Sequence, residues 1–298
     1  MTTILRNDAA REELEAFYER FRARIPDAHG RWVTTRFGDT HVLVAGRPEA
    51  PPLLLLHGAA SGSAHMMSAC LPLLDHFRVF APDMLGQSVK TIDARLPYRE
   101  AACGQWLVDV LDVLGVGRAH VYGASLGGFM ARKLAEHAPD RVDRLVLTVP
   151  AGIVTNSVAA VLSRFIIPKL IYRAFPSRDR LRRLVGSMMT TLDDEWIDYF
   201  DAAFRGFHLD LRMPPLASPE PLARFARPTL VFGASEDIFF PGAELLARAK
   251  VLFPLAETEL LLGCRHVLPM NDAFAEQYCA RVVRFLGEEW PGVGRGSS

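Results

Sequence analysis

Apolar residues follow two different spacings along most of the chain. Short, mostly apolar runs at residues 53–56, 144–149 and 227–233 have the length and composition of buried strands. Elsewhere, apolar residues recur every three or four positions, as they do over 103–114, which is the period of an α-helix with one buried face. Strands that alternate with helices predict an α/β protein with a mostly parallel sheet.

The two ends of the chain carry patterns of their own. Residues 8–25 are mostly charged with a narrow apolar stripe, which predicts an N-terminal helix that packs on the body, with a homodimer contact as the alternative. Residues 31–37 and 41–45 predict an antiparallel hairpin that opens the sheet. A last helix is expected over 272–286, followed by a frayed tail.

The alternation of strands and helices lapses between Pro150 and Pro228. Connections in α/β units are usually about 2–6 residues plus one helix, so this stretch is an insertion. Its spacing is helical over about 157–175, 178–189 and 193–208. Pro168 lies inside the first of these helices, where it predicts a kink or a break.

The insertion is rich in aromatic residues and methionine, which as a set predict an apolar pocket beneath it. The residues concerned are Met188, Met189, Trp196, Tyr199, Phe200, Phe204 and Phe207. Five arginines of the insertion are expected to be solvated, because arginines on helices usually are. They are Arg164, Arg173, Arg182, Arg183 and Arg205. The expected divisions of the chain are an N-terminal helix in 1–30, a core in 31–150 and 228–298, and the helical insertion in 151–227.

Composition limits the partners and the compartment. The 298 residues are 50% hydrophobic, enough for the core of one α/β domain. Basic and acidic residues both number 34, which argues against nucleic acid or an anionic membrane as the main partner. No run reaches the ~18 apolar residues that span a bilayer, and no apolar segment of signal-peptide length opens the chain. A cytoplasmic protein without membrane insertion is therefore expected.

The four cysteines, Cys70, Cys103, Cys264 and Cys279, lack the spacing of zinc ligands. We therefore expect free thiols, and we expect neither a metal nor a cofactor. Only four of the 34 basic residues are lysines, a usage typical of a GC-rich bacterial genome.

A serine lies at a sharp junction between a strand and a helix. Residues 123–127 read Gly-Ala-Ser-Leu-Gly, a strand-like run over 118–122 precedes them, and helical spacing continues from Phe129 to the residue before Pro139. In a G-x-S-x-G elbow, the glycines remove β-carbons that would clash in the tight turn, and the serine hydroxyl is exposed. The pattern predicts Ser125 as a nucleophile.

A serine nucleophile needs a base and a group that orients the base. Asp237 follows the strand-like run 227–233, and His266 follows a second such run at 257–263. Because open α/β sheets place their sites at the carboxyl ends of strands, we expect both side chains to meet Ser125. The chain order Ser, Asp, His is the order of the α/β-hydrolases.

The chain resembles the α/β-hydrolase family from about Arg31 to Phe285. Residues 53–58 (Leu-Leu-Leu-Leu-His-Gly) resemble the family's third strand and the His-Gly that follows it. Residues 83–88 (Asp-Met-Leu-Gly-Gln-Ser) resemble its D-x-x-G-x-S loop. The resemblance implies a mostly parallel eight-stranded sheet flanked by helices, with a helical cap inserted above a Ser-His-Asp triad.

The same resemblance assigns the remaining groups of the site. The backbone N–H groups of Leu126 and Ala59 are expected to form an oxyanion hole, one after the nucleophile and one in the loop after the third strand. The family's spacing after the strand at 227–233 favours Asp237 over its neighbour Glu236 as the acid.

Other polar residues near these motifs are expected to be structural. His57 is one, because His266 occupies the position of the base, and Asp83 is expected to fix its loop. Some relatives carry the acid after the sixth strand, but residues 148–152 contain no carboxylate. The loop 57–63 lacks the His-Gly-Gly-Gly form of many lipases, which argues against tertiary-alcohol esters and lipase-like substrates.

A fold of this kind supports many reactions, so the function has to follow from the site. A serine at the elbow excludes the dehalogenase and epoxide-hydrolase branches, which use aspartate there. The leading hypothesis is hydrolysis of a carboxylic ester, thioester or lactone of a small, mostly apolar substrate. The alternatives are a carbon–carbon hydrolase of the meta-cleavage type, a cofactor-free perhydrolase, and a non-catalytic ligand receptor.

Overall fold

The computed structural model describes residues 3–208, 210 and 212–287 of the chain. An eight-stranded sheet with the strand order β1-β2-β4-β3-β5-β6-β7-β8 forms its centre. β1 pairs antiparallel with β2 and β2 antiparallel with β4, and the other neighbours are parallel. The strands are β1 His29–Thr35, β2 Gly38–Ala45, β3 Pro52–Leu56, β4 Arg78–Pro82, β5 Ala119–Ala124, β6 Val142–Thr148, β7 Thr229–Ala234 and β8 Ala256–Leu261. The predicted fold class is confirmed.

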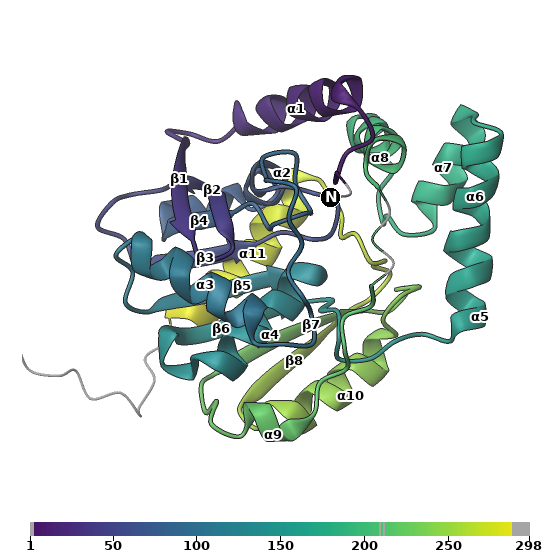
Figure 1. Ribbon diagram of the computed structural model, residues 1–298. Coiled ribbons are helices and arrows are strands. Elements are labelled where there is room, and N and C mark those ends of the chain that lie inside the picture. Colours follow the sequence, from purple (N-terminus) through teal and green to yellow (C-terminus); the bar gives the residue numbers. More distant parts are fainter. Residues whose placement is uncertain (1–2, 209, 211, 288–298) are drawn as a thin grey trace, which may run out of the picture.

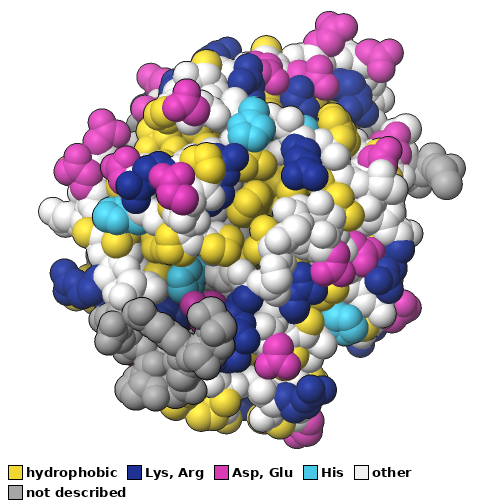
Figure 2. Space-filling model, turned by 90° about the vertical axis from the view of Figure 1, so that its left-hand side faces the viewer, with side chains coloured by type: hydrophobic (Ala, Val, Ile, Leu, Met, Phe, Trp, Pro, Cys, Tyr) yellow, Lys and Arg dark blue, Asp and Glu magenta, His cyan; other side chains and the backbone are white. Residues whose placement is uncertain are grey.

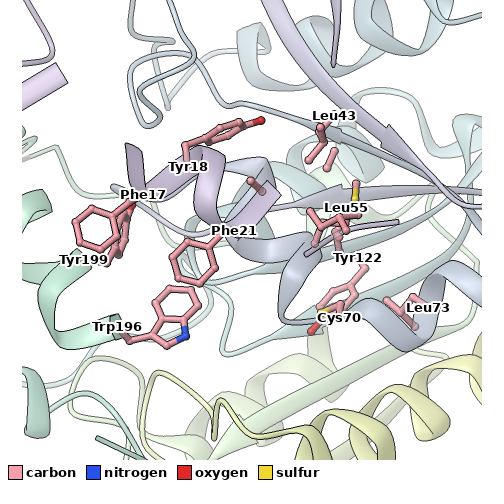
Figure 3. Close-up of a cluster of buried hydrophobic side chains, with 14 of the residues drawn as sticks. Phe17, Tyr18, Phe21, Leu43, Leu55, Cys70, Leu73, Tyr122, Trp196 and Tyr199 are labelled. Atoms are coloured by element: carbon pink, nitrogen blue, oxygen red, sulfur yellow. The ribbon is translucent and has the colours of Figure 1, made fainter. Parts of the chain in front are cut away.

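The central strands are continuously apolar because both faces of the sheet are covered. In β3, Leu53 and Leu55 point into one hydrophobic cluster, whereas Leu54 and Leu56 point into the other. This follows from the two-residue period of a strand. Figure 3 shows part of the first cluster, in which Leu55 lies close to residues from several other elements.

Helices cover the two faces and form a separate group to one side (Figure 1). α3 Ala102–Val113, α4 Leu126–His137, α9 Pro219–Leu222 and α10 Gly242–Leu252 contribute to one cluster. α1 Asp8–Arg22, α2 Ser63–Ser68, the 3₁₀ turn η1 Leu71–Asp75 and α11 Asp272–Gly287 contribute to the other. A further 3₁₀ turn, η2 Pro139–Arg141, leads into β6.

The insertion between β6 and β7 is helical. It consists of α5 Val158–Val161, a π-helical turn η3 Leu162–Ile166, α6 Ile167–Ala174, α7 Arg178–Gly186 and α8 Asp194–Gly206. The first predicted helix does not break at Pro168. A π turn, which is wider than an α-helical turn, directly precedes Pro168. The proline ring therefore avoids the usual clash with the carbonyl group one turn earlier.

The N-terminal helix connects the core to the insertion. The buried stripe of α1 is Leu14, Phe17, Tyr18 and Phe21, and the helix ends at Arg22 instead of residue 25. The ring of Phe21 lies 4.7 Å from that of Trp196 in α8. Figure 3 shows these aromatic side chains of α1 and α8 facing one another. The apolar stripe of α1 is therefore covered by its own chain.

The face drawn in Figure 2 carries both signs of charge. Acidic and basic side chains are interspersed around apolar side chains that gather near its middle, in keeping with the zero net charge. Within the described residues, no helix is long and apolar enough to cross a membrane. All four cysteines are buried and carry free thiols.

Candidate active site

Ser125 lies in a strained turn between β5 and α4. Its backbone has φ 51° and ψ −115°, in a region that residues with a side chain rarely adopt. The flanking glycines are required by close approach. A β-carbon on Gly123 would lie 2.3 Å from the carbonyl oxygen of Gly127, and one on Gly127 would lie 2.2 Å from that of Leu56. The turn thus presents the hydroxyl of Ser125 at the carboxyl end of the sheet.

The three predicted side chains form a hydrogen-bonded line. Ser125 Oγ lies 2.9 Å from Nε2 of His266. His266 Nδ1 lies 2.8 Å from Oδ2 of Asp237. With the proton on Nδ1, the ring donates to the carboxylate and can accept the hydroxyl proton of Ser125 at Nε2.

The acid and the imidazole are held from several sides. The side chain of Asp237 is fully buried, and its Oδ1 accepts hydrogen bonds from the backbone N–H groups of Phe239 at 2.7 Å and Phe240 at 3.1 Å. The rings of the same two residues stand edge-on to His266, with centroid distances of 4.9 and 5.3 Å. These contacts fix both the carboxylate and the ring plane before substrate arrives.

Glu236, the rival for the acid, faces another way. Its carboxylate forms a half-exposed ion pair with Arg265, with 3.3 Å between Oε2 and Nε. Glu236 is therefore engaged at the surface, while its neighbour Asp237 meets the histidine.

The two predicted oxyanion donors lie beside the serine. Leu126 is the first residue of α4, so its N–H has no acceptor within the helix. Ala59 follows Gly58, and a β-carbon on Gly58 would lie 3.7 Å from Cβ of Ser125. Ala59, Leu126 and Ser125 all line the same cavity.

The loop after β3 is held in place by contacts that the sequence did not reveal. The N–H of Ala60 donates to Oε1 of Gln87 at 3.2 Å. The hydroxyl of Tyr199, in α8, donates to the carbonyl oxygen of Ala60 at 2.7 Å. The sequence predicted Tyr199 only as a pocket residue, and Gln87 only as a variable position of the D-x-x-G-x-S loop.

His57 and Asp83 support this loop. His57 Nδ1 donates to the carbonyl oxygen of Gly58 at 2.7 Å, and Nε2 accepts the N–H of Met84 at 2.9 Å. Burial lowers the pKa of His57, in agreement with a neutral ring that donates once and accepts once. Asp83 is fully buried and accepts hydrogen bonds from Ser63 and Ser88.

A largely apolar cavity of about 590 Å³ opens over Ser125. One wall is a series of neighbouring rings, with centroid distances of 4.9 to 6.3 Å from one ring to the next. In order from the base, the series is His266, Phe239, Phe165, Phe204, Phe200 and Trp196. Four of these rings belong to the insertion, as do Met188, Tyr199 and Phe207, which also line the cavity.

Comparisons with known proteins place the chain in a family. A model of the alpha/beta hydrolase fold family matches residues 51–189. An uncharacterized carboxylesterase, nap, of Bacillus subtilis (strain 168) is 35% identical over 272 residues, which cover 89% of this chain and 88% of that protein. The chain belongs to the α/β-hydrolase family. This confirms that the protein is a serine hydrolase with the predicted fold.

Other relatives differ in the length of the match and in their activity. Carboxylesterase YbfK of the same strain is 38% identical, but over 40% of this chain and 40% of its own length. A 2-hydroxymuconate semialdehyde hydrolase of Pseudomonas sp. (strain CF600) is 36% identical, and the match covers 80% of the present chain and 87% of the Pseudomonas protein. The crystal structure of naproxen esterase (carboxylesterase NP) from Bacillus subtilis has a TM-score of 0.79 at 25% identity and covers 93% of this chain and 98% of that one.

Proposed function

We propose that this hydrolase cleaves small, mostly apolar carboxylic esters through an acyl-enzyme on Ser125. The observation that carries the proposal is the hydrogen-bonded line from Ser125 through His266 to Asp237, which opens into a cavity walled by aromatic rings. The carboxylesterases among the relatives support an ester as the bond that is cleaved.

In the first half of the reaction, Ser125 Oγ attacks the ester carbonyl while Nε2 of His266 accepts its proton. The N–H groups of Leu126 and Ala59 stabilise the oxyanion that forms. Asp237 keeps the imidazole in the required tautomer and stabilises its positive charge. His266 then donates the proton to the leaving alcohol, and the acyl group remains on Ser125.

In the second half, water takes the place of the alcohol. His266 removes a proton from the water, which attacks the acyl carbonyl, and the same two N–H groups hold the second oxyanion. Collapse of this intermediate returns the proton to Oγ and releases the carboxylic acid. Every step uses groups that are already in hydrogen-bond contact or line the cavity.

We also infer that residues 151–227 act as a cap over Ser125, between the core segments 31–150 and 228–298 and beside the N-terminal helix in 1–30. The aromatic side chains that the insertion contributes to the cavity support this role. A cytoplasmic location is part of the same proposal, and the four buried free thiols support it.

The test is covalent labelling combined with turnover. An activated fluorophosphonate should add once to the wild-type protein by intact mass spectrometry, and not to Ser125→Ala. Short p-nitrophenyl esters should be turned over by the wild type and not by this variant. Labelling that persists in Ser125→Ala would refute the nucleophile, and labelling without ester turnover would indicate a receptor.

A carbon–carbon hydrolase is the second candidate, because the 2-hydroxymuconate semialdehyde hydrolase matches over 80% of this chain and 87% of its own length. The same serine could attack a ketone beside the scissile bond. Comparing kcat/KM for a meta-cleavage dienone and a p-nitrophenyl ester on one preparation separates the two candidates. The ester should be preferred, and a higher kcat/KM for the dienone would favour the alternative.

A further inference from the structure

Helix α6 presents a lysine to the cavity and apolar side chains to solvent. Lys169 is partly buried and lines the same cavity as Ser125 and His266. On the same helix, Leu170 is 57% exposed and Ile171 is 47% exposed. Hydrophobicity alone favours the opposite rotation of the helix, with the lysine in water and the aliphatic residues inside.

The ammonium group of Lys169 lies over two aromatic rings. It lies 4.5 Å from the ring centroid of Phe204 and 5.7 Å from that of Phe165. Among the described residues, it has no carboxylate within ion-pair distance. Burial, together with the charges of Arg173 and Arg6, lowers the pKa of Lys169 to about 8. The ring faces compensate only part of the cost of desolvating this charge.

The two arginines in the cavity wall are already paired. Arg24 donates two hydrogen bonds of 2.7 Å to the carboxylate of Glu195. Arg212 donates to both oxygens of Asp210, at 2.9 and 2.7 Å. The other acid in the wall, Asp272, lies at the exposed start of α11.

The five arginines of the insertion that the sequence singled out are not among the described residues that line the cavity. Arg182 and Arg205 form ion pairs at the surface. Lys169 is therefore the cation of the wall that a substrate anion can bind without breaking an ion pair with another described residue.

A series of neighbouring aromatic rings leads from the catalytic histidine to Lys169. The ring of Phe239 touches His266, with 4.9 Å between centroids, and the ring of Phe165 lies 5.0 Å beyond Phe239. Lys169 lies over the ring of Phe165, with 5.7 Å between Nζ and the ring centroid. A substrate chain that lies along these rings would reach the ammonium with its remote end while its carbonyl is at Ser125.

We propose that Lys169 binds a carboxylate at the remote end of the substrate, so that the enzyme prefers apolar esters that carry such a group. The proposal rests on the ester hydrolysis proposed above and adds to it the substrate class. A substrate carboxylate would accept hydrogen bonds from the ammonium of Lys169, and these bonds are strong because both partners are charged. The pair would offset the desolvation cost of the lysine's charge, which the cavity wall offsets only in part.

The experiment compares esters of matched length with and without the charge. One series contains p-nitrophenyl half-esters of succinate, adipate and suberate, against the neutral acyl esters of the same lengths. A second series has the carboxylate on the alcohol side, as acetate esters of ω-hydroxy acids against alkyl acetates. In at least one series, the ratio of kcat/KM for the charged to the neutral ester should be about tenfold or more at its best length.

Three variants and one control assign the preference. Lys169→Met should bring the ratio to about one or below, Lys169→Glu should lower it further, and Lys169→Arg should retain it. Lys250→Met removes an exposed lysine from α10 and should keep the wild-type ratio. In wild type the ratio should fall as pH rises above about 8, because Lys169 loses its proton; in Lys169→Arg it should not. The ratio cancels the pH dependence of the catalytic steps that both esters share.

The result that would contradict the proposal concerns only the binding of the substrate carboxylate by Lys169. If wild type shows no preference for the charged ester in either series, or if Lys169→Met retains the preference, Lys169 does not bind the substrate anion. Turnover of the neutral esters and labelling of Ser125 report on ester hydrolysis itself, so a failure of that function is seen separately.

Discussion

At the elbow, the backbone of Ser125 is held at a positive φ by the strand before it and the helix after it. The helix can approach the strand only because Gly127 has no β-carbon. An alanine there would place a carbon 2.2 Å from the carbonyl oxygen of Leu56 and 2.6 Å from that of His57. These are backbone atoms at the start of the loop after β3, which carries Ala59, so relief of the clash must displace the site.

Gly127→Ala should therefore lower kcat by about a hundredfold or more, because a displacement of about 1 Å has that effect on catalysis. It should also lower the free energy of unfolding by about 1–3 kcal/mol, as overpacking does. Ester kinetics and urea denaturation measure the two effects. Gly117→Ala is the control, since its β-carbon would meet nothing within 4 Å. Equal kinetics in the two variants would contradict this account of the turn.

The neighbouring carboxylates provide a second prediction at the residue scale. His266→Ala should lower kcat by about 10⁴ or more, and Asp237→Asn somewhat less. Glu236→Gln should stay near wild type, because Glu236 only pairs with Arg265 at the surface. Kinetics on one p-nitrophenyl ester check all three. A severe loss in Glu236→Gln with normal activity in Asp237→Asn would move the acid to Glu236.

Between elements, the most informative contact joins α8 to the loop after β3. Tyr199 is buried and donates its hydroxyl proton to the carbonyl oxygen of Ala60, next to the proposed donor Ala59. The insertion thus lines the cavity over Ser125 and also holds the loop that carries the proposed oxyanion donor. The contact couples the position of α8 to catalysis.

Tyr199→Phe should lower kcat by about tenfold, because the donor at Ala59 is less well held, and should cost about 1 kcal/mol of stability. Tyr172→Phe is a matched control. That buried tyrosine donates to Asp201 within the insertion, so its loss should affect stability but not kcat. Measurements of kcat and of urea midpoints for both variants decide the matter. The same loss of kcat in both would show that the contact to Ala60 has no special role.

The sequence was sufficient for elements whose signal is local. Leu53 to Leu56 form an unbroken apolar run because successive residues face opposite covered faces of one sheet. Ser125, Asp237 and His266 could be named because each follows a strand whose end lies at the same edge of the sheet.

Features that depend on tertiary contact could not be predicted. The π turn before Pro168, the bond from Tyr199 to Ala60 and the inward rotation of Lys169 have no local signal. Periodicity alone predicts Lys169 in solvent. The insertion contains several arginines because arginine is common in this chain, but a residue type does not reveal which way its helix is turned.

At the scale of the whole molecule, three parts of the chain meet at His65. This residue of α2 is 2% exposed, and its ring lies 4.6 Å from that of Phe21 in α1 and 4.1 Å from that of Tyr199 in α8. Neither ring nitrogen has a hydrogen-bond partner among the described residues. Burial, with a smaller effect of His57, lowers the pKa of His65 to about 3. The junction between core, N-terminal helix and insertion therefore contains a histidine that is neutral when folded.

This histidine should make the fold sensitive to acid. Above the unfolded pKa of about 6.5, His65 is neutral in both the folded and the unfolded state. As the pH falls below 6.5, only the unfolded chain takes up the proton. The free energy of unfolding therefore falls between about pH 6.5 and 3, by up to about 1.4 kcal/mol per pH unit. His65→Phe should make the pH dependence of the urea-derived free energy of unfolding shallower by up to that amount, and at pH 8 it should stay within about 1.5 kcal/mol of wild type. Met67→Leu, a buried substitution in the same helix, should leave the slope unchanged. Parallel pH profiles for His65→Phe and wild type would show that the proton is taken up elsewhere, and that the junction does not determine how the molecule responds to acid.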